Sequence, residues 1–199
     1  MNPLWDLIGL KGVGKAACKA AVANAEKKFP KIYNYLESFG CKKPKFSCKC
    51  CGTTPEGGAL QGSAKWPFFP KGSTKISLCH DNISSALKLD ETMRHELIHA
   101  SQYCMGDRPA GFDKKGSPRD CLRREAEAYC RQNPSRPAIN WPLDDPDPVI
   151  QQIRKIQIDS LRKNARDSCS LSFSEQEINE VIEDVIPYDY ECRDRFKGF

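Results

Sequence analysis

The segment ETMRHELIHA, residues 91–100, decides how the rest of the chain is interpreted. His95 and His99 are four residues apart, so on an α-helix both imidazoles lie on one face, one turn apart. This arrangement suits two neighbouring ligands of a tetrahedral Zn²⁺. Glu96 follows the first histidine, where it can take a proton from a metal-bound water and return it to a leaving amine. The pattern predicts a zinc site with a general base, and the alternative is a helix whose histidines only cap or line a core.

The residues around this segment predict an amphipathic helix of about fifteen residues. Its first turn is expected at Asp90 or Glu91, where the helix dipole favours negative charge. Gly106 is the expected stop. The side opposite the histidines is apolar and can enter a core; it carries Met93, Leu97, Ile98 and Ala100.

A tetrahedral zinc site needs a third protein ligand, and the chain has only three histidines, at positions 80, 95 and 99. A further histidine a few residues beyond His99 is therefore excluded, and a glutamate on a second helix is the natural substitute. Ser117 and Pro118 predict the start of that helix, with Asp120 completing a capping box.

Glu125 is the predicted third ligand on this second helix, and Glu127 is the alternative. The two side chains are about 200° apart around a helix, so both cannot face one metal ion. Glu125 is favoured because small Ala128, one turn later, allows close approach of two helices around the metal. An ordinary solvated glutamate remains the alternative for either residue.

These segments resemble a known family. The strand-like ISLCHDNI at 76–83, the zinc segment at 91–100 and the Glu-x-x-Ala of the second helix are similar to the metallopeptidases of the mitochondrial intermembrane space, and the cysteines at 48–51 fit the same pattern. The resemblance covers roughly residues 41–130 and is loose over 150–199. It implies a zincin fold and a zinc endopeptidase that processes a membrane subunit of the ATP synthase and helps to assemble it, peripheral to the inner membrane.

Two residues depart from that family. Gln102 stands where the family usually has an acidic residue, and Glu127 stands where it usually has an arginine. Both lie near the expected metal, so its surroundings and the substrate are expected to differ.

The composition predicts a modest core reinforced by crosslinks. Hydrophobic residues make up 39% of the 199 residues and charged residues 29%. Eleven cysteines allow at most five disulfides and leave at least one thiol. Cys48 and Cys51 have the spacing of half a zinc knuckle, but no second well-spaced pair completes it. Disulfides are the better interpretation, and they indicate an oxidising compartment.

The predicted fold class is α+β: a mainly helical, zincin-like protein with a small β-sheet and several disulfides. Residues 1–131 are expected to form the catalytic domain, with a basic helical N-terminus. Residues 132–148, rich in Pro and Asp, are a linker, and residues 149–199 are a pair of helices packing on the catalytic domain.

Three finer expectations follow from the pattern. Lys75 to Cys79 is a predicted strand, on whose edge a zincin would hold an extended peptide. The C-terminal helices are expected over 149–166 and 175–186, the second with a capping box, and Cys169 and Cys192 are candidates to clamp it. His80 could touch substrate, but an exposed turn histidine is the simpler interpretation.

Charge and hydropathy limit the partners. Residues 1–50 contain ten lysines and three acids, a local charge of +7, which fits either an anionic membrane surface or a solvated helix face. Nucleic acid is disfavoured because no recognition motif accompanies the charge. No run of 18 apolar residues exists, so no transmembrane helix is expected, and the N-terminus lacks the apolar core of a secretory signal.

The expected activity is zinc-dependent hydrolysis of a protein or peptide substrate by an endopeptidase, with zinc held by His95, His99 and Glu125. One alternative is an assembly chaperone or binding protein with a vestigial or minor protease site. Another is a secreted metallopeptidase effector, since the motif is shared and only the compartment differs.

Overall fold

The computed structural model describes residues 12–51, 74–104, 116–132, 146–188 and 190. The chain divides into two compact units, Met1–Met105 and Gly106–Phe199. The expected division into 1–131, 132–148 and 149–199 remains a prediction. The mainly helical character with a small sheet and several disulfides is as expected for the fold class.

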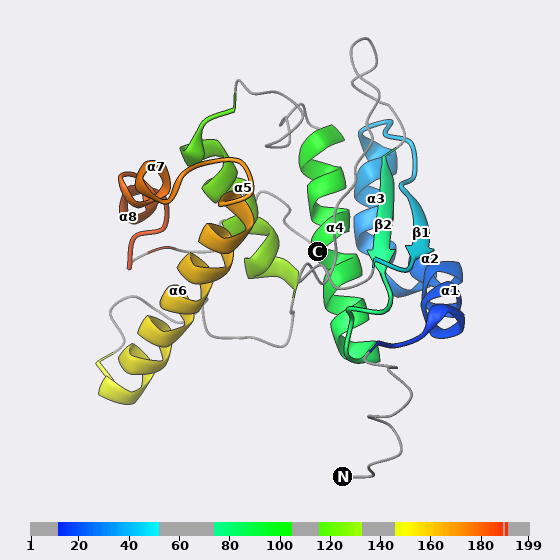
Figure 1. The fold of residues 1–199 in the computed structure, drawn as a ribbon, viewed down its shortest axis with the longest axis horizontal. Coiled ribbons are helices and arrows are strands. Elements are labelled where there is room, and N and C mark those ends of the chain that lie inside the picture. The colour runs from blue at the N-terminus through cyan, green and yellow to red at the C-terminus, as the bar shows by residue number, and fades with distance from the viewer. Residues whose placement is uncertain (1–11, 52–73, 105–115, 133–145, 189, 191–199) are drawn as a thin grey trace. The chain divides into compact units, whose positions relative to one another are not determined.

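The first unit contains a two-stranded parallel sheet. Strand β1, Lys45–Lys49, pairs with β2, Lys75–Cys79, in a register that places Phe46 opposite Ile76 (Figure 1). The predicted strand at Lys75–Cys79 is confirmed. Four consecutive residues of β2 are buried, whereas β1 is exposed at alternate positions. A strand that is buried on both faces is expected to be mainly apolar. Ile76, Leu78 and Cys79 give β2 this character.

The first unit also holds α1, Lys15–Ala23, α2, Ala25–Lys28, α3, Pro30–Ser38, and α4, Ala86–Cys104. Helix α1 lies against β1 and α4, and α3 lies against α4. Pro30 begins α3 as predicted, and Gly40 follows its end with a φ of 70°, a conformation that favours glycine. The buried faces of α3 and α4 form much of this core through Ile32, Leu36, Met93 and Leu97.

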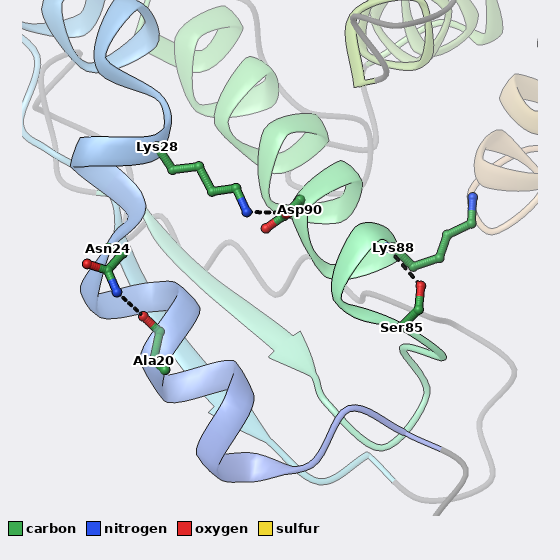
Figure 2. Close-up of polar contacts among 6 residues, drawn as sticks. All are labelled: Ala20, Asn24, Lys28, Ser85, Lys88 and Asp90. Carbon is green, nitrogen blue, oxygen red and sulfur yellow. Dashed lines mark hydrogen bonds and ion pairs between the residues drawn. The ribbon is translucent and has the colours of Figure 1, made fainter.

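Helix α4 begins one turn earlier than predicted and has 19 residues instead of about fifteen. The Lys88 backbone N–H donates to Ser85 Oγ at 3.2 Å, so a serine caps the helix ahead of the acidic residues (Figure 2). Asp90 instead forms an ion pair with Lys28, which joins α4 to α2 (Figure 2). The predicted stop at Gly106 lies outside the described residues.

Three disulfides staple the first unit. They join Cys18 to Cys48, Cys41 to Cys104, and Cys51 to Cys79. The half zinc knuckle is therefore excluded, because its two cysteines belong to separate disulfides. The carboxyl end of the parallel sheet, at Cys48 and Cys79, and the last residue of α4 are held by covalent bonds, which compensates for a small core.

Cys50 remains a thiol next to these disulfides, and it is exposed. Its Sγ donates to the Asp81 carboxylate at 3.0 Å. The same carboxylate accepts from the Cys51 backbone N–H, with N–O distances of 3.0 and 2.9 Å. Asp81 thus orders the segment that leaves β1.

The second unit contains α5, Pro118–Gln132, α6, Pro148–Cys169, α7, Glu175–Asn179, and α8, Ile182–Val185. Helices α5 and α6 lie side by side, and α7 and α8 pack on α5 (Figure 1). One buried cluster joins all four helices; it contains Cys121, Leu122, Ala126, Ile158, Leu161, Ala165, Cys169, Ile178, Ile182 and Ile186.

The helix starts of the second unit use the capping serines that the sequence predicts. Ser117 Oγ accepts from the Asp120 backbone N–H at 3.1 Å, and Ser174 and Glu177 form a full capping box. Helix α6 starts at an Asp147 cap, close to the predicted boundary.

Two expectations for the C-terminal part are wrong. The predicted helix over 175–186 breaks into α7 and α8 at Val181, whose φ of −126° is not helical. The break accompanies burial of Ile178, Ile182 and Ile186 in one cluster. Cys169 bonds to Cys121 of the neighbouring helix α5, so it is not available to pair with Cys192, which lies outside the described residues.

Within the described residues, none of the helices combines the length and apolar character needed to cross a lipid bilayer.

We expect the Cys121–Cys169 disulfide to contribute strongly to the stability of the second unit. It closes a separation of 48 residues, for which chain entropy gives about 4 kcal/mol. The double variant Cys121→Ala/Cys169→Ala should lower the free energy of unfolding by about that amount in urea titrations followed by circular dichroism. Cys50→Ala, which removes an exposed thiol, is the control and should change it by about 0.5 kcal/mol or less. Equal midpoints for the double variant and the wild type would contradict this role.

Candidate metal centre

His95 and His99 lie one turn apart on α4 and face each other. Their Nε2 atoms are 3.0 Å apart, and the rings meet edge to face with centroids 4.6 Å apart. Two nitrogens bound to one Zn²⁺ at ~2.0–2.1 Å with a tetrahedral angle would be about 3.3 Å apart. The two imidazoles therefore already converge at nearly the spacing that a shared metal ion requires.

Gln102 fixes the orientation of the second imidazole. Its Oε1 lies 2.8 Å from His99 Nδ1, and the glutamine is 1% exposed. The contact spans three residues along α4, so it lies on the histidine face. It leaves His99 Nε2 directed at His95.

Glu96 lies between the two histidines in the sequence and is 4% exposed. Its Oε2 is fully buried. A carboxylate shielded from bulk water next to two candidate metal ligands has the chemistry of a general base. Its place on α4, directly after His95, brings it to the turn that carries the two histidines.

The opposite side of α4 holds the helix in place. Met93, Leu97 and Ile98 are at most 1% exposed within the core of the first unit. Arg94 extends over the ring of Phe29, 5.4 Å from its centroid, and burial lowers the pKa of its guanidinium. Since α4 cannot rotate without exposing these side chains, the direction of the imidazoles is set by core packing.

Glu125 and Glu127 both lie on α5, in the second unit. Glu125 is half-buried and Glu127 is 7% exposed. The predicted donor set consists of His95 and His99 of the first unit with Glu125 of the second. Two imidazoles and one carboxylate suit zinc, so these residues fit the predicted group. The roles of the individual residues remain predictions.

His80 lies in the turn after β2 and does not belong to this donor set. Its Nδ1 is buried, and its backbone N–H donates to the Lys49 carbonyl at 3.1 Å.

Two residues of this region were missed or only partly understood from the sequence. The sequence does not single out Ser85 as the cap of α4, because the acidic residues further on offer an equally good start. For Gln102 it indicates only a departure from a family pattern. Its spacing of three residues from His99 was the signal that could have predicted the hydrogen bond.

Comparison with known proteins gives one partial similarity. The chain is 33% identical over 72 residues to a zebrafish (Danio rerio) protein described as "Mitochondrial inner membrane protease ATP23 homolog". The match covers 35% of this chain and 24% of that relative. No family model matches, and no solved structure matches. Together with the His and Glu donor set, this distant similarity to a protease supports a protease-like function.

The three histidines give a direct test of the metal centre. We expect His95→Ala and His99→Ala each to weaken zinc binding in calorimetric titration by more than the ~10–100-fold typical of residues that only support a ligand. His80→Ala is the matched control and should bind zinc as the wild type does. Loss of zinc from the control, with binding intact in either of the others, would place the metal elsewhere.

Proposed function

We propose that the protein is a zinc-dependent endopeptidase. The observation that carries the proposal is the convergence of His95 Nε2 and His99 Nε2, 3.0 Å apart on a helix whose next residue after His95 is a buried glutamate. A helix that only used its histidines for packing would not need a buried carboxylate beside them. The distant similarity to a protease supports the same reaction class.

The proposed chemistry assigns one task to each side chain. Zinc, when bound, supplies a Lewis acid for the scissile carbonyl and lowers the pKa of its water to about 7. Glu96 then takes a proton from the attacking water and delivers it to the departing amine. The low exposure of Glu96 keeps bulk water from competing for that proton.

The third ligand in this proposal is Glu125. Its carboxylate would complete the two imidazoles into a set of three protein ligands and leave the fourth position for water or substrate. Glu127 is the alternative, and its burial favours a structural role in α5.

We further propose that the protein acts on a protein substrate in the mitochondrial intermembrane space, peripheral to the inner membrane. The name of the zebrafish relative supports the organelle, and the disulfides support an oxidising compartment. The +7 charge of residues 1–50 fits contact with an anionic lipid surface.

Glu96→Gln separates catalysis from metal binding. The variant should bind zinc as the wild type does, because no ligand is changed, but its peptidase rate should fall by about 10²–10⁴-fold because the general base is lost. Cleavage of a fluorogenic peptide library, with zinc measured by elemental analysis, gives both quantities. An undiminished rate would refute the role of Glu96. Absence of activity in the wild type as well would favour the assembly or binding role.

Substitutions on α5 distinguish the two glutamates. Glu125→Ala should lose stoichiometric zinc and, with it, the stability that metal binding adds to the folded state. Glu127→Ala should retain zinc. The reverse result would make Glu127 the ligand, and zinc retained in both variants would place the third ligand outside α5.

A further inference from the structure

We propose that Gln102 is a positioning residue of the metal site. Its side-chain oxygen holds His99 with the proton on Nδ1, so that Nε2 presents a lone pair where the metal binds. Because the partner is a neutral amide, the site also binds zinc less tightly than it would with a carboxylate. The inference rests on the proposed metal-binding function.

The amide of Gln102 directs its oxygen at the imidazole of His99. Oε1 of Gln102 lies 2.8 Å from His99 Nδ1, and a carbonyl oxygen can only accept a hydrogen bond. His99 Nδ1 must therefore be the donor. A glutamine that is 1% exposed cannot readily exchange this partner for bulk water. The side chain thus acts on the ring through this short contact.

The contact between His95 and His99 shows what the hydrogen bond to Gln102 achieves. With Nδ1 protonated, neutral His99 has a lone pair on Nε2, so the 3.0 Å contact between the rings places the donated proton on His95 Nε2. His99 is then ready to bind a metal without any change of tautomer. His95 must move its proton to Nδ1 before it can ligate. Gln102 therefore prepares one of the two histidines in advance.

The neutrality of the amide has a measurable consequence. A carboxylate on the far nitrogen of a metal-binding imidazole both orients the ring and raises its basicity, and such partners contribute ~10–100-fold to metal affinity. An amide oxygen orients the ring in the same way but carries no charge. Gln102 should therefore supply the orientation and only part of the affinity.

The tautomer can be tested without any metal. In nitrogen NMR spectra of the metal-free protein with labelled histidine, we expect His99 to carry its proton on Nδ1. The Gln102→Met variant, which keeps volume but loses the acceptor, should shift His99 toward the Nε2-protonated form. Ser101→Ala is the matched control, because Ser101 is equally buried on the same turn but bonds to the Leu97 carbonyl. An unchanged His99 tautomer in Gln102→Met would overturn the proposal.

Zinc affinity tests the statement that a neutral amide at position 102 gives weaker zinc binding than a carboxylate. Gln102→Met should bind zinc about tenfold or more weakly, and Gln102→Glu should restore binding and exceed the wild type by about tenfold. Circular dichroism confirms that each variant is folded. Equal or weaker binding by folded Gln102→Glu would overturn the statement about charge. If the wild type bound no zinc while its His99 tautomer still depended on Gln102, the peptidase proposal and the metal-site role would fall, and only the orientation of His99 by Gln102 would stand.

Discussion

The burial of α4 is the constraint on which the rest of the structure depends. Met93, Leu97 and Ile98 fill the core of the first unit, and this fixes the rotation of the helix about its axis. Since His95 and His99 share the remaining face, their convergence is a consequence of hydrophobic packing elsewhere on the same helix. The site needs no strained backbone, and no non-glycine residue with positive φ occurs among the described residues.

Disulfides compensate for the low proportion of hydrophobic residues in the chain. In the first unit, the disulfides Cys18–Cys48 and Cys51–Cys79 hold a sheet of only two strands. Such a sheet is marginal by itself, because too few residues share its buried face. The disulfide Cys41–Cys104 secures the end of α4, five residues beyond His99 and nine beyond His95. In the second unit, Cys121–Cys169 crosses the buried cluster between α5 and α6. Crosslinks thus anchor both helices that carry candidate ligands.

The polar residues around the candidate centre have two kinds of role: some orient the histidines, and Glu96 is the candidate for the chemistry. Gln102 orients His99, and Glu96 is kept buried beside the pair. Ser85 and Lys28 act further away, by capping α4 and by pairing with Asp90 (Figure 2). These outer contacts hold α4, the helix that carries both imidazoles. The geometry of the His-Glu-x-x-His segment therefore depends on contacts outside the segment.

The sequence by itself determined the elements whose signals are local. Helical spacing placed the two imidazoles on one face, the alternation at Lys75–Cys79 predicted β2, and Ser117 and Ser174 predicted two helix starts. Only the tertiary structure decided which cysteines pair, because disulfides depend on distances between segments far apart in the chain. It also decided the break at Val181, where the backbone leaves helical geometry although Ile178, Ile182 and Ile186 keep the spacing of one continuous helix face. The hydrogen bond between His99 and Gln102 is intermediate: the sequence sets their spacing of three residues, but the strength of the bond depends on burial, which only tertiary packing provides.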